Sequence, residues 1–122
     1  MSSYRRWMYR LPAVLFSVGI VVTSSQPAMV PQPFSFADKV YHFFGYMLYG
    51  STLILAMRTM PITDPRRFWW AVVIGLVFAA TDELHQAFVP GRSADVLDWC
   101  ADALGIGLAV TIAAVRKPYA NS

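Results

Sequence analysis

Four long apolar runs constrain this chain most strongly. Short segments rich in proline or charge separate them, and we predict membrane-spanning helices over about residues 7–25, 38–59, 67–88 and 94–116. Each run has the roughly twenty residues that a helix needs to cross the hydrocarbon core of a bilayer. The composition agrees, because only 14% of the residues are charged, against about 25% in an average soluble domain. The predicted fold is an all-α bundle of four transmembrane helices that forms one domain, residues 1–122.

Local signals mark the connections between these helices. Three prolines in residues 26–36 exclude a regular helix, so we predict a loop there. Pro90-Gly91 fits a tight turn, with Pro at its second position and Gly at its third. Ser93 is the predicted N-cap of the fourth helix. The basic, apolar start also fits a signal peptide, but residues 24–28 lack a clean small-x-small cleavage site, so we predict an uncleaved first helix.

Two further features concern packing on the fourth helix. Ala101, Gly105 and Ala109 are spaced by four residues, which gives a small-residue stripe that lets another helix approach closely. Cys100 is the only cysteine, and we interpret it as a small buried hydrophobic residue.

The basic residues predict the orientation of the chain. Eight of the ten lie at the two ends and in the second connection: Arg5, Arg6, Arg10, Arg58, Arg66, Arg67, Arg116 and Lys117. Four spans place these three segments on one side, so the positive-inside rule predicts that both termini are cytoplasmic. Six of the seven acidic residues then belong to the outer half. Small basic groups at the ends of apolar runs do not form the basic face that nucleic acid requires, so we predict no nucleic-acid partner.

Helical spacing gives three of the predicted helices a polar stripe near their outer ends. The stripes are Lys39, His42 and Tyr46; Asp82, His85 and Gln86, with Glu83 beside them; and Asp95, Asp98 and Asp102. A charge facing lipid costs roughly 2.5–3.5 kcal/mol at the bilayer centre. We therefore predict that the stripes face one another around an outward-facing polar pocket, with Lys39 and Arg92 balancing some of the carboxylates.

The chemistry of this pocket is open to several interpretations. Two histidines with several carboxylates offer donors for a divalent metal, although the sequence DELHQ matches no established zinc signature. No other cofactor is predicted. Glu83 or Asp82 with His42 or His85 offers a general acid and base. The alternative is structural: Asp95 and Asp98 cap the fourth helix, and Lys39 pairs with Asp38 or another nearby carboxylate.

Two blocks resemble the VanZ-like family of small bacterial membrane proteins. The first is DKVYHFFGYMLYG, residues 38–50, and the second is DELHQAFVPGRSADVLDWCADALG, residues 82–105. Asp102 departs from the pattern, which usually has Asn there. The resemblance implies one VanZ-like domain, a multi-pass protein of the bacterial cytoplasmic (inner) membrane. The family's namesake is associated with low-level resistance to the glycopeptide teicoplanin.

These observations lead to three functional hypotheses. The first is an envelope protein whose outer pocket binds or acts on an envelope lipid, a lipid-linked cell-wall precursor or a glycopeptide. The second is a membrane-embedded acid–base or metal-dependent hydrolase or transferase, with Glu83, Asp82 and His42 as its catalytic set. The third is a structural membrane partner subunit. The residues predicted to contact a substrate are Lys39, Tyr46, Gln86, Arg92, Asp95, Asp98 and Asp102. Partners other than the lipid bilayer, and the oligomeric state, stay open.

Overall fold

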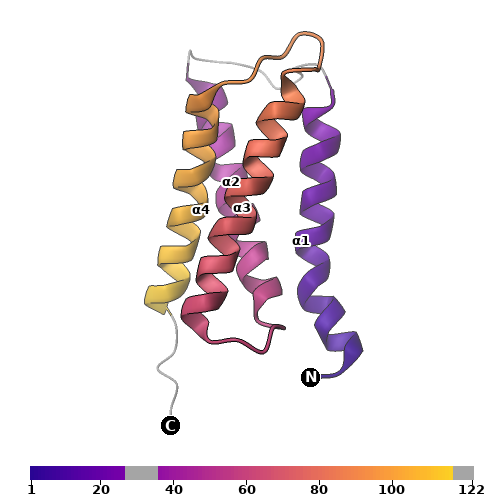
Figure 1. The fold of residues 1–122 in the computed structure, drawn as a ribbon, viewed down its shortest axis with the longest axis vertical. Helices are drawn as coiled ribbons and strands as arrows, with labels where there is room; N and C mark the ends of the chain where they lie inside the picture. The colour runs from indigo at the N-terminus through magenta and orange to yellow at the C-terminus, as the bar shows by residue number, and fades with distance from the viewer. Residues whose placement is uncertain (27–35, 117–122) are drawn as a thin grey trace.

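A bundle of four helices, each antiparallel to the one before it in the chain, makes up the computed structural model, which describes residues 1–26 and 36–116 (Figure 1). The helices are α1, Ser3–Ser24; α2, Ala37–Met57; α3, Asp64–Gln86; and α4, Val96–Arg116. All four are long and apolar enough to cross a membrane. The predicted all-α fold of four membrane helices is confirmed. Most of the loop predicted for residues 26–36 lies outside the described residues.

The starts of α1 and α3 precede the predicted ones. Ser2 caps α1, because its side chain accepts a hydrogen bond from the backbone N–H of Arg5 at 3.3 Å. Pro12 lies inside α1 without ending it, which a membrane helix tolerates. α3 begins at Asp64 and takes Pro65 into its first turn, where the missing backbone N–H costs nothing.

The connection between α3 and α4 corrects one prediction and confirms another. α4 begins at Val96, and its cap is Asp95 rather than Ser93, because Oδ1 of Asp95 accepts from the backbone N–H of Leu97 at 2.9 Å. The predicted Pro90-Gly91 turn is present. Gly91 has a φ of 80°, and a hydrogen bond of 3.1 Å closes the turn from residue 92 to residue 89. Such a positive φ favours glycine.

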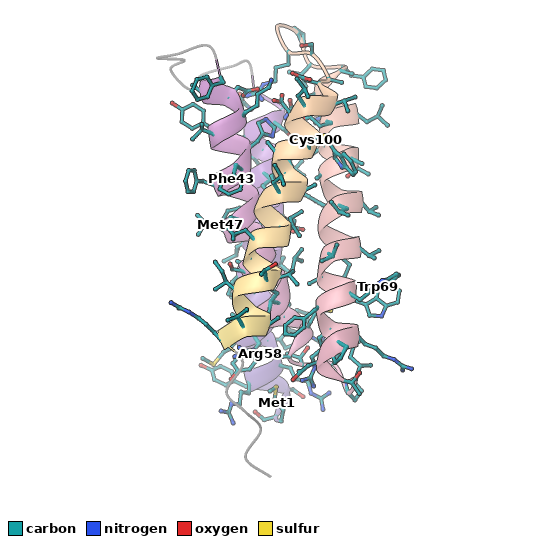
Figure 2. The ribbon with its side chains drawn as sticks, turned by 90° about the vertical axis from the view of Figure 1, so that its left-hand side faces the viewer. Met1, Phe43, Met47, Arg58, Trp69 and Cys100 are labelled. Atoms are coloured by element: carbon teal, nitrogen blue, oxygen red, sulfur yellow. The ribbon has the colours of Figure 1, made fainter. Side chains whose placement is uncertain are left out.

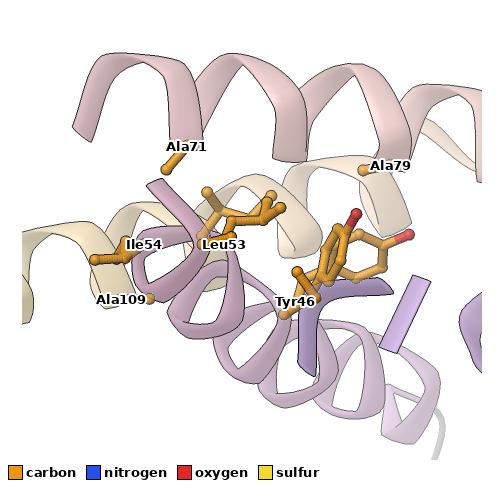
Figure 3. Packing of buried hydrophobic residues seen from close by; sticks show 10 residues of the cluster. Tyr46, Leu53, Ile54, Ala71, Ala79 and Ala109 are labelled. Atoms are coloured by element: carbon orange, nitrogen blue, oxygen red, sulfur yellow. The ribbon is translucent and has the colours of Figure 1, made fainter. Parts of the chain in front are cut away.

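The closest helix pair is α2 with α4, and small residues make this approach possible. A methyl group on Gly105 would overlap the backbone carbonyl oxygen of Phe43. One on Gly50 would lie 3.2 Å from the Cβ of Ala109. Ala101, Gly105 and Ala109 are buried, so the predicted small-residue stripe is confirmed. Figure 3 shows Leu53 and Ile54 of α2 among the buried hydrophobic residues, with alanines contributed by α3 and α4.

The two ends of the bundle differ in charge. One end, which we call the basic end, holds the start of α1, the α2–α3 connection and the end of α4. Its arginines are Arg5, Arg6, Arg10, Arg58, Arg66, Arg67 and Arg116. The opposite end, which we call the polar end, is where α2 and α4 begin and α1 and α3 finish. Figure 2 shows Met1 and Arg58 at the basic end and Cys100 toward the polar end. Cys100 is exposed, so its predicted burial is wrong.

Candidate functional site

His42 of α2 lies at the centre of the polar end. Its Nδ1 is 2.7 Å from Oδ1 of Asp102 on α4 and 3.7 Å from Oε1 of Glu83 on α3. Its Nε2 is 3.7 Å from Oδ2 of Asp98 and 3.8 Å from Oδ1 of Asp38. Asp102 is completely buried, and Glu83 and Asp98 are almost so. One imidazole therefore meets carboxylates from three helices.

Lys39 joins the start of α2 to the start of α4. Its Nζ lies 2.6 Å from Oδ2 of Asp95 and 2.9 Å from Oδ1 of Asp98. The hydrogen bond from Lys39, followed by that from the backbone N–H of Leu97, holds the pKa of Asp95 below its ordinary value. Lys39 therefore makes the predicted structural pairing with nearby carboxylates, but its partners are Asp95, just before α4, and Asp98 in its first turn rather than the neighbouring Asp38.

Two more contacts fix the carboxylates of α3. The hydroxyl of Tyr46 donates to Oδ2 of Asp82 at 2.9 Å, and both residues are buried. Oε2 of Glu83 accepts from the backbone N–H of Asp95 at 3.1 Å. Gln86 is also buried. The inward face of α3 at this end therefore consists of Asp82, Glu83 and Gln86.

His85 lies apart from this cluster. It is exposed, and its Nε2 is 2.9 Å from Oγ of Ser25 at the end of α1. Asp82 and Gln86 of the predicted stripe face inward, but Glu83 rather than His85 completes the inward face. His85 follows Glu83 by two residues, which turns it to a different side of the helix. It does not join His42 as a second imidazole of one site.

Arg92 is held by backbone carbonyls. Its Nε donates to the carbonyl oxygen of Gln26 at 2.7 Å, and its Nη2 donates to that of Thr23 at 3.3 Å. A cation at this place donates hydrogen bonds to carbonyl groups at the C-terminal end of α1, and the negative end of the α1 dipole stabilises its charge. Of the two cations predicted to offset the charge of the carboxylates, Lys39 contacts two of them, whereas Arg92 connects the α3–α4 connection to the end of α1.

A cavity of about 550 Å³ lies beside this cluster, which we call the α1–α2 cavity. Its apolar lining comes from Pro12, Leu15, Phe16, Gly19, Ile20 and Gly45, and its polar lining from Thr23, Ser24, Asp38, Tyr41, His42, Tyr46, Gln86 and Arg92. Among the described residues, the lining includes His42 but neither Asp82 nor Glu83. His42 and Tyr46 therefore form a wall between the cavity and the buried carboxylates.

Some buried carboxylate oxygens have no hydrogen-bond partner among the described residues. They are Oδ1 of Asp82, Oε1 of Glu83, Oδ2 of Asp102 and Oδ1 of Asp98. Of these four, the oxygen of Asp98 has Lys39 as an ion-pair partner. Buried carboxylates normally have such partners, since leaving a charged group unpaired in a low-dielectric interior is costly. Among the described residues, the carboxylates of the polar end thus outnumber the basic side chains that contact them, Lys39 and His42.

Comparison with protein families identifies the chain. The family model described as VanZ/LLP1 matches residues 3–117. The chain belongs to the VanZ/LLP1 family. The match spans all four helices, so this VanZ/LLP1 protein is a multi-pass membrane protein. Searches of curated proteins and of solved structures give no significant match.

The sequence prediction missed the part that α1 has in the candidate site of this VanZ/LLP1 protein. It treated the first helix as a plain span, yet residues 12–24 supply half of the cavity lining. Gly19, among larger apolar residues, and the hydroxyls of Thr23 and Ser24 were the available signals. Asp38 was also left out of the predicted contacts, although its carboxylate faces both His42 and the cavity.

Proposed function

We propose that this VanZ/LLP1 protein binds an amphipathic envelope molecule, an envelope lipid or a lipid-linked cell-wall precursor, in the α1–α2 cavity. The observation that carries the proposal is the two-part lining of this cavity. α1 supplies mostly apolar side chains, and the polar end supplies hydroxyl, amide, imidazole and charged groups. Its volume of about 550 Å³ falls within the roughly 300–1,000 Å³ typical of ligand pockets.

The apolar part suits a hydrocarbon chain. Between Pro12 and Ile20 the cavity follows α1 for about 12 Å, at 1.5 Å per residue. A chain in this part exchanges lipid neighbours for protein neighbours and gains little from the hydrophobic effect, since both are equally apolar. Recognition then depends on the head group, which the polar lining contacts.

The polar part suits an anionic head group such as a phosphate. Arg92 contributes a guanidinium cation to the cavity lining, whereas Lys39 does not line the cavity and pairs with Asp95 and Asp98. The planar guanidinium donates several hydrogen bonds at once, which matches phosphate oxygens. The amide of Gln86 and the imidazole of His42 offer further donors. Asp38 limits the site to head groups that also carry a donor, because a bare anion would be repelled by its carboxylate.

We also propose that the polar end faces away from the cytoplasm, so that both ends of the chain are cytoplasmic. Seven arginines lie at the basic end, and the positive-inside rule assigns such an end to the cytoplasm. Reporter fusions to each terminus test this orientation. Activity of a cytoplasm-dependent reporter at both ends is expected, and activity of a periplasm-dependent reporter at either end would contradict it.

Glycines that line the cavity provide a sharp test of the binding proposal. A Cβ on Gly19 or Gly45 meets no atom within 4 Å, so the side chains of Gly19→Leu and Gly45→Leu start from open space in the cavity lining and take up part of its volume. Gly107→Leu is the matched control, because Gly107 also has free space but does not line the cavity. Lipids retained after purification into nanodiscs are measured by mass spectrometry. We expect one enriched lipid class in wild type and Gly107→Leu, and its loss in both cavity variants; equal retention in all four proteins rejects the proposal.

An enzyme of lipid-linked substrates is the second candidate, and the His42–Asp102 contact favours it. A carboxylate that orients an imidazole beside a ligand cavity is an arrangement used for general acid–base catalysis. Glu83 and Asp82, the other members of the predicted catalytic set, lie behind this wall, so their effect on a substrate would pass through His42 and Tyr46.

Two substitutions separate the candidates in a cellular assay such as resistance to teicoplanin. Glu83→Gln keeps the shape of the side chain and removes its acid–base capacity, so full activity of this variant rejects an enzyme that needs Glu83. Loss of activity in Arg92→Ala, with retention in Glu83→Gln, favours binding. If both variants behave as wild type, the chain acts as a structural partner subunit.

A further inference from the structure

The carboxylate cluster behind the cavity wall has a feature that lipid binding does not use. His42 Nδ1, one oxygen of Glu83 and one oxygen of Asp102 lie within 4.8 Å of one another. The three side chains come from α2, α3 and α4, so the bundle itself positions them. We propose that these three residues bind a divalent transition-metal ion.

The unpartnered oxygens are the first argument. Asp102 is 0% exposed and Glu83 is 6% exposed, and each has a buried carboxylate oxygen with no hydrogen-bond partner among the described residues. Such an oxygen needs a donor or a cation nearby to offset its lost hydration. A divalent ion between the two side chains supplies one positive charge for each carboxylate.

The distribution of cations selects this side of the imidazole. A second possible donor group, Asp38, His42 and Asp98, surrounds Nε2. Lys39 already lies 2.9 Å from Oδ1 of Asp98, so that group has a cation of its own. Around Nδ1, the imidazole of His42 is the one basic group that the described residues place beside Glu83 and Asp102.

The neighbouring contacts resemble the support that metal ligands normally have. Glu83 binds the proposed ion through one oxygen, while its other oxygen, Oε2, accepts from the backbone N–H of Asp95. With Nδ1 bound to the ion, Nε2 of His42 carries the proton and faces the carboxylates of Asp98 and Asp38 at 3.7 and 3.8 Å. A carboxylate behind a metal-bound histidine fixes the tautomer and orients the ring.

The donor set indicates the class of metal. One imidazole nitrogen and two carboxylate oxygens suit Zn²⁺, Mn²⁺ or Fe²⁺, whereas Mg²⁺ and Ca²⁺ prefer oxygen donors alone. Binding is balanced by proton release: the hydrogen shared by His42 Nδ1 and Asp102 Oδ1 leaves, so that Nδ1 and the carboxylate of Asp102, including its unpartnered Oδ2, become available to the ion. The sequence DELHQ gave no sign of such a site, because its ligands come from three separate helices.

The test uses the full chain, purified in detergent with a tag that contains no histidine and stripped by a chelator. Co²⁺ serves as the probe, because its visible absorption reports nitrogen and oxygen coordination. We expect wild type to bind one Co²⁺ per chain, and Zn²⁺ to displace it. Glu83→Gln and Asp102→Asn remove an anionic ligand at nearly constant shape and should weaken binding by at least about tenfold.

His85→Ala is the matched control, because it removes the other imidazole of the polar end, which lies outside the cluster. It should bind Co²⁺ as wild type does. Absence of saturable Co²⁺ binding in wild type, or equal affinity in Glu83→Gln and Asp102→Asn, overturns the proposal. If either variant does not fold, thermal unfolding of wild type and His85→Ala decides: a higher Tm with Co²⁺ in both supports the site, and an unchanged Tm overturns it.

Discussion

Gly105 is the residue at which the packing of α2 against α4 is most sensitive to one added methyl group. A Cβ at this position would overlap the carbonyl oxygen of Phe43 and lie 2.9 Å from the backbone nitrogen of Met47. Both atoms belong to the backbone of α2, so no side chain can rotate away to make room. Gly105→Ala therefore forces the two helices apart.

The size of the effect follows from two opposing contributions. Overpacking of this kind costs about 1–3 kcal/mol, whereas replacing Gly by Ala inside a helix gains up to about 1 kcal/mol. Gly107→Ala isolates the second contribution, because a methyl there meets no atom within 4 Å. We expect the free energy of unfolding of Gly105→Ala to lie at least about 1 kcal/mol below that of Gly107→Ala.

Unfolding in mixed detergent micelles, followed by circular dichroism, measures this difference. The separation of α2 from α4 also stretches the contact between His42 and Asp102, which lie one residue before Phe43 and three before Gly105. Metal or lipid binding should therefore weaken together with stability. Equal stability of Gly105→Ala and Gly107→Ala would show that the α2–α4 contact is looser than described, and would refute the reasoning.

Three further predictions concern the polar contacts. Lys39→Met leaves the buried carboxylate of Asp98 without its cation and should lower the free energy of unfolding, measured by chemical unfolding, by about 1–3 kcal/mol. This is less than the roughly 3–5 kcal/mol for a fully buried pair, because the Lys39 side chain is 34% exposed. The pKa of Asp95 is lowered in the folded protein, so its carboxylate contributes fully to stability above the ordinary carboxyl pKa of about 3.9 and loses this contribution as the pH falls through the folded-state pKa. Asp95→Asn should therefore flatten the acid side of a plot of Tm against pH. Tyr46→Phe removes the hydrogen bond to Asp82, whose other oxygen is already unpartnered, and should cost about 1–3 kcal/mol in the same unfolding assay.

The fold could be predicted from the sequence because its determinants are local. The length of each apolar run, the small-residue stripe through Gly105 and the Pro90-Gly91 turn each specify structure over a few residues. The ends of the helices are not specified in this way, because capping depends on which of two neighbouring side chains reaches a free backbone N–H. Asp95 takes this role from Ser93 by bonding to Leu97.

The candidate site was predictable only in part, because its geometry depends on how helices rotate against one another. Spacing placed Lys39, His42 and Tyr46 on one face, and the structure turns all three toward carboxylates of the other helices. Spacing alone could not tell whether His85 or Glu83 faces inward, since both border Asp82 and Gln86. Nor could it show that α1 leaves a cavity beside α2, which is a property of packing between helices.

His42 connects the two proposed sites, and this sets the order in which they should be tested. One side of the residue lines the α1–α2 cavity, while its Nδ1 lies against Asp102 and Glu83. A substitution of His42 would therefore disturb lipid and metal together and could not distinguish them. Gly45→Leu fills the cavity and leaves the donor atoms of the cluster in place, whereas Asp102→Asn alters the cluster without lining the cavity. If each variant abolishes only its own ligand, the sites are independent. If Asp102→Asn also releases the lipid, the cluster orients His42 toward the head group, and the two sites are coupled through His42.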